Sequence, residues 1–327
     1  MAPVRMAVVG AGHFGALHAE KVARLDGAEL VAVVDVDAKR ARKVAKKQRS
    51  TASDDLDAVL GQVDAIDVVT PIQSHHDVAK AALERGVHVL VEKPVTARVE
   101  EARELCELAH ARGLVLQVGH LVRFSELSRM LQERVRNPLY IECIRVAPFK
   151  LRGTDVNVIL DLMIHDVDLI LSFMPAEIID VDAAGADVFS QSEDIANARI
   201  KFANGCIASI TASRVALKTE RKMRVFEPNC YTTVDYATST LRAYRRGHGT
   251  AALGIPNLDI AKHEFGEADL LLREIEAFVE SVRTGTPPEV SGEDGLRALE
   301  AAIRINESIR AHAAFVAKRT AAEGSAA

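Results

Sequence analysis

The stretch at residues 4–15, VRMAVVGAGHFG, decides the fold of the first half of the chain. A short apolar run of strand-forming residues ends at Gly10, and Gly10, Gly12 and Gly15 have the spacing G-x-G-x-x-G. A helical pattern, ALHAEKVARL, follows at once. Glycines between a strand and a helix allow a tight turn and a close approach to a pyrophosphate at the helix N-terminus. The sequence therefore predicts a dinucleotide-binding βαβ unit; the alternative is a tight turn that binds nothing.

Asp35 lies twenty residues beyond Gly15, at the carboxyl end of the second predicted strand, residues 29–34. A carboxylate at this place accepts hydrogen bonds from both ribose hydroxyls of an adenosine and repels a 2′-phosphate. We therefore expect NAD as the cofactor, with NADP as the less favoured alternative.

A basic segment follows, because seven of the eleven residues from 39 to 49 are lysine or arginine. We interpret it as the solvated face of a helix. The alternative is that Lys39 or Arg40 accommodates a 2′-phosphate. No aromatic residue interleaves with these charges, which disfavours a nucleic-acid site.

Strand and helix patterns go on alternating up to residue 119, which predicts a parallel sheet with helices on both faces. Ligands of such sheets bind beyond the carboxyl ends of the strands. Three of those ends carry polar side chains: TPIQSH at residues 70–75, VEKP at residues 91–94 and Gly119-His120. Thr-Pro and Lys-Pro also stop strands, but a lysine aimed at a cofactor crevice favours a functional role. The predicted cofactor-binding residues are Gly10, Gly12, His13, Phe14, Gly15, Asp35, Thr70, Pro71, His75, Glu92 and Lys93.

Residues 157–173, NVILDLMIHDVDLILSF, have the pattern of a helix that is apolar nearly all round and therefore buried. Asp161 and His165 are four residues apart and share one helical face. A buried carboxylate beside a histidine fixes the tautomer of the ring and tunes its basicity, as in a general base. A structural pair and a pair of metal ligands are the alternatives. Asp166 and Asp168 have no interpretation from the pattern.

The second half continues with period-two segments between residues 178 and 246, and Asn204-Gly205 is its strongest hairpin signal. This pattern predicts an antiparallel, open-faced sheet, whose uncovered side favours a homo-oligomer, a dimer or a tetramer. Residues 248–262 look loop-like. Further helices are expected at residues 270–282 and 296–315.

With 327 residues the chain exceeds one ordinary core, so we expect two domains. Residues 1–122 form the expected α/β Rossmann domain. Residues 123–317 form an α+β domain for substrate binding and oligomerisation, and residues 318–327 a flexible tail. The last long helix is expected to pack beside the helix at residues 157–173 or back on the first domain. The net charge of −5 gives no field that recruits nucleic acid or an anionic membrane. Scattered cysteines, the lack of an apolar leader and the lack of a bilayer-spanning run favour a cytoplasmic protein without a metal site.

Taken in order, GAGHFG, Asp35, TPIQSH, VEKP and DLMIH resemble the glucose-fructose oxidoreductase / inositol dehydrogenase / MocA (Gfo/Idh/MocA) family. The resemblance spans most of the chain. It implies a two-domain NAD(P)-dependent oxidoreductase that acts on sugars, cyclitols or related polyols. It also implies a catalytic trio of Lys93, Asp161 and His165.

Three further segments, GHLVRFSE, RGTDVNVILDLMIHDVDLIL and RKMRVFEPNCYTTVDY, resemble the subgroup of this family that oxidises nucleotide-linked amino sugars. This narrower resemblance implies NAD-dependent oxidation of the 3-hydroxyl of UDP-N-acetylglucosamine, on the route to the 3-amino sugars of lipid A. Other nucleotide sugars, free sugars and inositol are the alternatives. The loop at residues 149–156, FKLRGTDV, either grips a diphosphate or is simply solvated. The predicted substrate-binding residues are Lys93, Arg123, Lys150, Arg152, Asp161 and His165.

The expected reaction is hydride transfer from a secondary alcohol carbon to the nicotinamide ring. His165, oriented by Asp161, is the expected general base, and Lys93 stabilises the negative charge that develops on the substrate oxygen. Lys93 as the base is the alternative. The competing classes of protein are a dinucleotide-binding sensor without turnover and a metal-dependent hydrolase that uses Asp161 and His165 as ligands.

Overall fold

The computed structural model describes residues 2–150, 156–250 and 256–324. The chain divides into two compact units. Unit 1 comprises Met1–Phe124 and Asp269–Leu299, and unit 2 comprises Ser125–Ala268 and Glu300–Ala327. Within the described ranges, no helix has a stretch long and apolar enough to cross a bilayer.

Unit 1 is built on a parallel sheet whose strands lie in the order β3-β2-β1-β4-β5-β6. The order reverses at β1, which creates the switch point where α/β sheets bind their ligands. This sheet confirms the predicted Rossmann architecture. The strands are β1 (Val4–Val9), β2 (Ala28–Val34), β3 (Thr51–Ser53), β4 (Ala65–Val68), β5 (His88–Glu92) and β6 (Leu116–Gly119).

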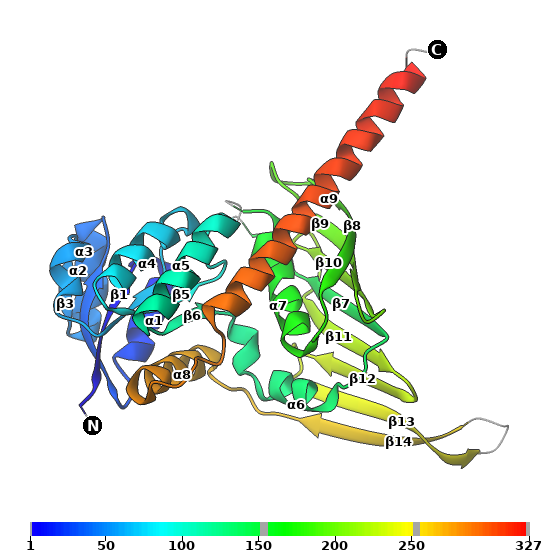
Figure 1. The fold of residues 1–327 in the computed structure, drawn as a ribbon, viewed down its shortest axis with the longest axis horizontal. Coiled ribbons are helices and arrows are strands. Elements are labelled where there is room, and N and C mark those ends of the chain that lie inside the picture. The colour runs from blue at the N-terminus through cyan, green and yellow to red at the C-terminus, as the bar shows by residue number, and fades with distance from the viewer. Residues whose placement is uncertain (1, 151–155, 251–255, 325–327) are drawn as a thin grey trace. The chain divides into compact units, whose positions relative to one another are not determined.

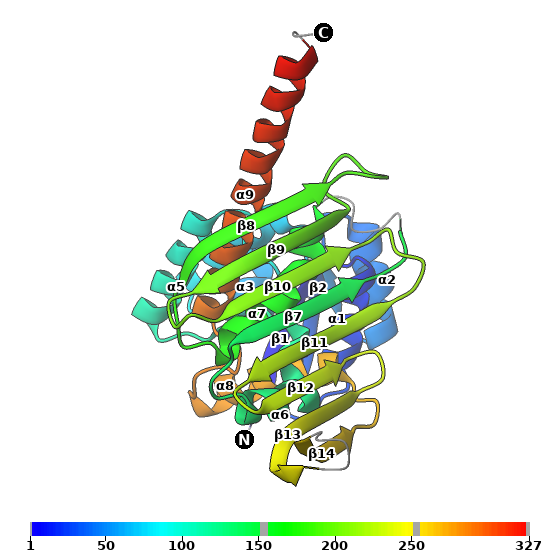
Figure 2. The same cartoon turned by 90° about the vertical axis from the view of Figure 1, so that its right-hand side faces the viewer.

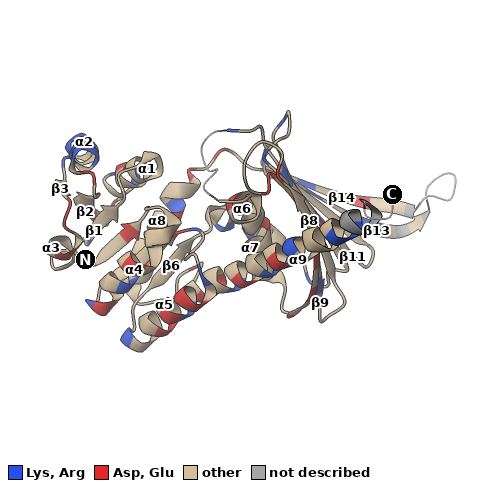
Figure 3. Cartoon of the chain, turned by 90° about the horizontal axis from the view of Figure 1, so that it is seen from above, with Lys and Arg blue, Asp and Glu red and all other residues tan. Residues whose placement is uncertain are grey.

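Helices cover both faces of this sheet. Figure 3 places α1 and α2 on one face and α3, α4 and α5 on the other. Their bounds are α1 (His13–Val22), α2 (Ala38–Gln48), α3 (Leu56–Leu60), α4 (His75–Glu84) and α5 (Val99–Arg112).

Helix α8 (Leu270–Thr284) follows the second sheet in the sequence but packs into unit 1. Its buried residues Ile275, Phe278 and Val279 share a core cluster with residues of β1 and with Val22 of α1. The sequence boundary had placed this helix with the second domain. An apolar helical face shows that a helix is packed, but it does not show which core receives it.

Unit 2 is built on an open-faced sheet in the order β14-β13-β12-β11-β7-β10-β9-β8, in which only the β7–β10 pair is parallel among the described strands. Figure 2 shows this sheet with α7 behind it. Alternation of buried and exposed residues along β9 fits one covered face and one open face. The bounds are α6 (Glu126–Arg134), β7 (Tyr140–Val146), α7 (Ile164–Phe173), β8 (Ile178–Ala186), β9 (Ile195–Phe202), β10 (Ile207–Ser213), β11 (Glu220–Glu227), β12 (Cys230–Asp235), β13 (Thr240–Thr250) and β14 (Pro256–Glu264).

The expectation of a loop at residues 248–262 is wrong where the structure describes that segment. β13 runs to Thr250, β14 pairs with it antiparallel, and residues 251–255 lie outside the described part. β14 is an edge strand whose apolar residues Leu258 and Ile260 are 55% and 62% exposed. Such a strand is held through its main chain, so it leaves little hydrophobic pattern to detect.

The predicted flexible tail is likewise helical over most of its length, because α9 runs from Gly292 to Gly324 (Figure 1). The segment at residues 311–324, AHAAFVAKRTAAEG, is rich in alanine, the strongest helix former. Local propensity therefore extends the helix beyond the apolar pattern that had set its expected end.

Candidate functional site

The glycine loop has the backbone geometry that a dinucleotide requires. Gly10 has φ +107°, and a Cβ there would lie 2.4 Å from the carbonyl oxygen of Val69. A Cβ at Gly15 would lie 1.8 Å from the carbonyl oxygen of Gly10. At Gly12, by contrast, no described atom lies within 4 Å of an added Cβ. Gly10 and Gly15 are therefore needed for packing, whereas Gly12 leaves the open approach that a pyrophosphate uses.

Helix α1 begins directly after this loop, with Gly12 at its N-cap. No side chain caps it, so its first amide groups point out of the helix without a side-chain acceptor. His13 and Phe14 lie on this first turn, and Phe14 is 64% exposed. The free helix end and the open space at Gly12 fit the phosphates of a dinucleotide.

Asp35 is tied to the glycine loop. Its Oδ2 accepts a hydrogen bond of 2.7 Å from the Ala11 amide, and its Oδ1 accepts one of 2.8 Å from the Asp37 amide. Each carboxylate oxygen can accept a second bond, so both ribose hydroxyls can still be received. Arg40 Nε lies 3.9 Å from Asp35 Oδ1 and donates to Asp37 at 3.0 Å. The Asp35 carboxylate and the Arg40 guanidinium group thus lie close together in unit 1.

Helix α2 carries the basic run on its solvent side, and the blue segments of Figure 3 mark it. Its buried residues are Ala41, Val44 and Ala45. All seven lysines and arginines between residues 39 and 49 are exposed, which agrees with the interpretation of a solvated face.

His75 is buried and holds two strand ends together. Its Nε2 lies 2.9 Å from the carbonyl oxygen of Thr70, and its Nδ1 lies 2.9 Å from that of Pro94. The ring therefore connects the turn after β4 with the segment after β5. Thr70 Oγ1 is buried and has no hydrogen-bond partner among the described residues. Pro71, also a predicted cofactor-binding residue, is the N-cap of the short 3₁₀ turn that leads into α4.

Lys93 follows β5 directly and is half-buried. Glu92 Oε2 accepts a hydrogen bond of 3.1 Å from the Lys93 amide, so the carboxylate holds the main chain of the lysine. Pro94 is buried and ends the strand. The ends of β4 and β5 are adjacent because those strands pair in parallel, so Thr70, His75 and Lys93 come from one edge of the sheet.

Asp161 and His165 lie where a π turn passes into an α-helix. The turn spans Ile159–Met163, and α7 starts at Ile164, whereas the sequence had predicted one regular helix. A single π turn widens a helix locally and is frequent at functional sites. Asp161 and His165 are both half-buried, while the neighbouring side chains Met163 and Ile164 are fully buried.

Asn157 fixes the start of this helix. Its Oδ1 accepts a hydrogen bond of 3.2 Å from the Leu160 amide. Its Nδ2 donates to Asn306 Oδ1 on α9 at 2.7 Å and to Glu193 Oε2 at 3.2 Å. The turn that contains Asp161 is therefore anchored by residues far away in the sequence.

Asp166, which the sequence left without an interpretation, pairs with Arg145 on β7. Arg145 Nε donates to Asp166 Oδ2 at 2.8 Å, and Nη2 donates to Oδ1 at 2.7 Å. Both side chains are buried. The pair joins α7 to the sheet next to His165. Sequence reasoning missed Arg145, although an arginine at a buried position of a strand was a detectable signal.

The remaining predicted substrate-binding residues differ in their burial and surroundings. Arg123 is 8% exposed and donates from Nη2 to the carbonyl oxygen of Glu289 at 3.2 Å, within unit 1. Lys150 is exposed in the segment after β7. Arg152 lies outside the described residues. Asp168 is buried.

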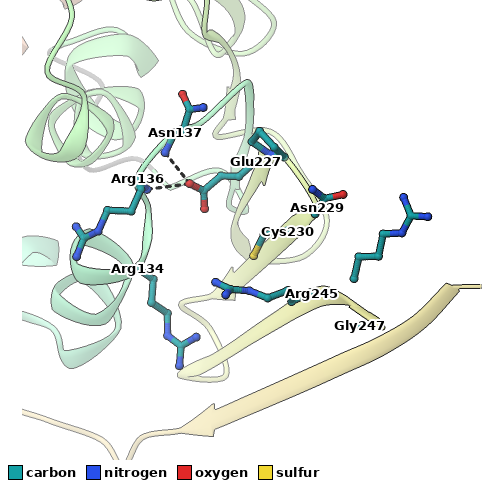
Figure 4. Close-up of a pocket in the computed structure, with 10 residues that line it drawn as sticks. Arg134, Arg136, Asn137, Glu227, Asn229, Cys230, Arg245 and Gly247 are labelled. Carbon is teal, nitrogen blue, oxygen red and sulfur yellow. Dashed lines mark hydrogen bonds between the residues drawn. The ribbon is translucent and has the colours of Figure 1, made fainter. Parts of the chain in front are cut away.

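A pocket of about 660 Å³ opens elsewhere in unit 2 (Figure 4). It lies between the end of α6, the β11–β12 turn and β13, and Arg134, Arg136, Arg245 and Arg246 line it. Glu227 Oε1 there accepts hydrogen bonds from the amides of Arg136 and Asn137. None of the predicted site residues lines this pocket.

Comparison with known proteins identifies the family of this chain. Residues 4–120 match the family model described as an oxidoreductase family with an NAD-binding Rossmann fold, and residues 147–227 match the GFO/IDH/MocA C-terminal domain. The chain is 39% identical to UDP-N-acetylglucosamine 3-dehydrogenase of Acidithiobacillus ferrooxidans, over 95% of this chain and 99% of that protein. A solved structure of that enzyme matches with a TM-score of 0.89 over the same shares. Myo-inositol 2-dehydrogenase of Thermotoga maritima is 27% identical, over 90% and 93% of the two chains.

These matches cover both sheets and confirm the resemblance that the ordered motifs carried. The glycine loop and Asp35 lie within the residues that match the NAD-binding Rossmann model. This chain belongs to the Gfo/Idh/MocA family of NAD-binding oxidoreductases.

Proposed function

We propose that this protein oxidises the 3-hydroxyl of UDP-N-acetylglucosamine with NAD as the hydride acceptor. The observation that carries the proposal is the 39% identity to the 3-dehydrogenase of A. ferrooxidans through nearly the whole of both chains. The inositol dehydrogenase of T. maritima is only 27% identical. A nucleotide sugar is therefore the better supported substrate, and an inositol is the second candidate.

His165 is the proposed general base. A secondary hydroxyl near neutral pH does not release hydride while it keeps its proton, so a group must accept that proton. Asp161, four residues earlier, is the proposed orienting carboxylate, which leaves one ring nitrogen unprotonated for the substrate. When bound, the dinucleotide supplies the carbon that accepts the hydride.

Lys93 is the proposed hydrogen-bond donor to the substrate oxygen. An ammonium group at that oxygen stabilises the negative charge that grows as the proton leaves. Glu92 supports this role because it holds the Lys93 amide. Gly10, Gly12, Gly15, Asp35 and Thr70 belong to the proposed dinucleotide site on the same sheet edge.

The nucleotide part of the substrate needs cations for its diphosphate. Lys150, which is exposed, is one proposed partner. Arg152 is the second, and it enters the proposal by its place in the sequence. The product would be a 3-keto nucleotide sugar, which an amino-group transfer would convert to a 3-amino sugar of the kind used in lipid A. We place both steps in the cytoplasm.

The test is a substrate panel with purified protein, in which reduced nicotinamide absorbance is followed with UDP-N-acetylglucosamine, UDP-glucose, glucose and myo-inositol. A ketone trap such as hydroxylamine should be present, because oxidation of an alcohol by NAD is unfavourable without removal of the product. We expect turnover of UDP-N-acetylglucosamine, with the 3-keto position verified by reduction with borodeuteride. Turnover of myo-inositol with UDP-N-acetylglucosamine inert would overturn the proposal.

We also propose that a second copy of the chain covers the open face of the unit 2 sheet. An aromatic row crosses that face through Tyr140, Phe226, Tyr231 and Tyr244, with successive ring centroids 5.7, 4.8 and 5.4 Å apart. Phe226 is 37% exposed, and burial of such a row stabilises an interface. The test is the molar mass in solution. We expect Phe226→Glu to dissociate the oligomer and Leu217→Glu, at a fully exposed position outside the sheet, to leave it intact. A monomeric parent protein would refute the proposal.

A further inference from the structure

Four ionisable side chains of unit 1 gather around the strand that leads to Lys93. They are His18 of α1, Asp67 of β4, Glu92 of β5 and Glu274 of α8, and we name them the His18 cluster. His18, Asp67 and Glu274 are 1%, 0% and 1% exposed. Burial of so many ionisable groups is costly unless they compensate one another, so their arrangement calls for a function.

The imidazole ring of His18 lies between two carboxylates. Its Nδ1 forms a hydrogen bond of 2.8 Å with Asp67 Oδ2, and its Nε2 lies 3.2 Å from Glu92 Oε1 in an ion-pair contact that does not have the geometry of a hydrogen bond. A neutral ring has a single N–H group and can donate to one of them, whereas an imidazolium can donate to both. Burial alone would lower the pKa of His18, but the charge and hydrogen bond of Asp67 and the nearby Glu92 carboxylate hold that pKa well above its usual value. The position of the ring between two carboxylates therefore favours its protonated form.

Glu92 passes this contact on to Lys93. While Oε1 faces His18, Oε2 accepts the hydrogen bond of 3.1 Å from the Lys93 amide. His18 and Lys93 are thereby connected through a single carboxylate. Because α1 begins at the glycine loop, this connection joins the helix of the proposed dinucleotide site to Lys93.

Glu274 lies close to Glu92. Burial and the nearby negative charge of Glu92 raise the pKa of Glu274 well above its usual value, which favours its neutral form. Neither of its oxygens has a hydrogen-bond partner among the residues that the structure describes. A Cβ at Gly119 would lie 3.1 Å from Glu274 Oε1 and 3.3 Å from Glu92 Cδ, so the glycine makes room for the two carboxyl groups.

We propose that His18 is a positioning residue for Lys93, acting through Glu92: it fixes the Glu92 carboxylate that anchors the lysine main chain. The inference rests on the proposed function only for the role of Lys93 in catalysis. The anchoring itself is a property of the fold of unit 1. Sequence analysis did not single out His18, although a histidine three residues past Gly15 and an aspartate inside the apolar strand AIDV were its signals.

The test uses two substitutions that each keep one half of the bridge. Asparagine places its amide near the position of Nδ1 and keeps the donor to Asp67, whereas glutamine reaches the position of Nε2 and keeps the donor to Glu92. Hydrogen exchange at the Lys93 amide is the first measurement, because it requires no substrate. We expect exchange to become at least about tenfold faster in His18→Asn and to stay near the parent rate in His18→Gln. Equal protection of this amide in both variants would overturn the proposal.

The second measurement is the kinetics with whichever sugar the parent enzyme oxidises. Misplacement of a catalytic group by about 1 Å can reduce the rate about a hundredfold. We expect His18→Asn to lower kcat between about tenfold and a hundredfold, with little change in the dissociation constant of NAD, and His18→Gln to restore most of kcat. His18→Leu, which removes both ring nitrogens, should behave like His18→Asn if the latter does not fold. A parent protein that oxidises no sugar refutes the proposed function, while the exchange result still decides the anchoring.

Discussion

Arg145 on β7 and Asp166 on α7 are joined by two hydrogen bonds of 2.8 and 2.7 Å, and the pair is buried next to His165. A bidentate pair of this kind fixes both the distance and the rotation of the helix relative to the strand. The ion pair therefore fixes the helix backbone at the position next to His165, the proposed base.

Asp166→Ala should be strongly destabilising, because it leaves the Arg145 charge buried without compensation. We expect a loss of about 3–5 kcal/mol in the free energy of unfolding, measured by urea titration. The matched control is Asp180→Ala. Asp180 also pairs at 2.7 Å, with Lys201, but both side chains are about half exposed, and such a pair contributes at most about 1 kcal/mol. Similar losses in the two variants would contradict the assignment.

His165→Asn and Lys93→Met should both lower kcat, but by different routes. Loss of a general base reduces the rate by about 10²–10⁴-fold and removes the acidic limb of the pH profile. Loss of a charge-stabilising donor reduces kcat while that limb stays. NAD affinity, measured by calorimetry, should change little in His165→Asn. If the acidic limb disappears in Lys93→Met and persists in His165→Asn, the lysine is the base.

Asp35→Ser should weaken NAD binding and improve NADP binding. The carboxylate that receives the ribose hydroxyls would be lost, and a charge-assisted hydrogen bond contributes about 1.5–3 kcal/mol, or about ten- to a hundredfold in KM. Arg40 would then be free to meet a 2′-phosphate, because its Nε lies only 3.9 Å from Asp35. Arg42, exposed on the same helix, provides the control: Asp35→Ser/Arg40→Ala should lose the gain with NADP, and Asp35→Ser/Arg42→Ala should keep it.

Glu274→Gln should increase stability at high pH. Burial and the charge of Glu92 raise the pKa of Glu274 in the folded protein. In the unfolded chain the pKa of a glutamate is about 4.3. The protonated form therefore stabilises the fold below that pH, and the contribution is lost as the pH rises toward the folded pKa. Glutamine keeps a neutral amide throughout, so its advantage in Tm should grow from about pH 5 to about pH 8. Glu276→Gln, exposed on the same helix, should run parallel to the parent protein.

Local patterns were sufficient to predict the Rossmann unit. The glycine spacing, the acid at the end of β2 and the alternation of strand and helix are contained in short segments, and their physical requirements are local. The antiparallel sheet of unit 2 was predicted for the same reason wherever one face of a strand is buried. The edge strand β14 was missed because Leu258 and Ile260 are exposed, so burial does not shape its sequence.

Contacts between distant residues could not be predicted in this way. The partner of Asp166 is 21 residues away, and Asn157 is held by Asn306, 149 residues away. The π turn before α7 depends on such contacts, since its residues have an ordinary helical pattern. His18 and Asp67 each looked like a single polar residue in an apolar segment, and only the fold brings them to 2.8 Å.

The open space at Gly12 separates what folding demands from what ligand binding demands within one loop. An alanine methyl group at Gly15 would collide with the carbonyl of Gly10, so the polypeptide itself rejects it. The same methyl group at Gly12 would contact no described atom apart from its chain neighbours. The protein without a ligand therefore tolerates it, and only a bound pyrophosphate would collide with it. A library sorted for expression level would thus retain alanine at Gly12 and discard it at Gly15, whereas a library sorted for turnover would discard both. Gly12→Ala is in consequence the natural choice for a folded but inactive protein in genetic complementation.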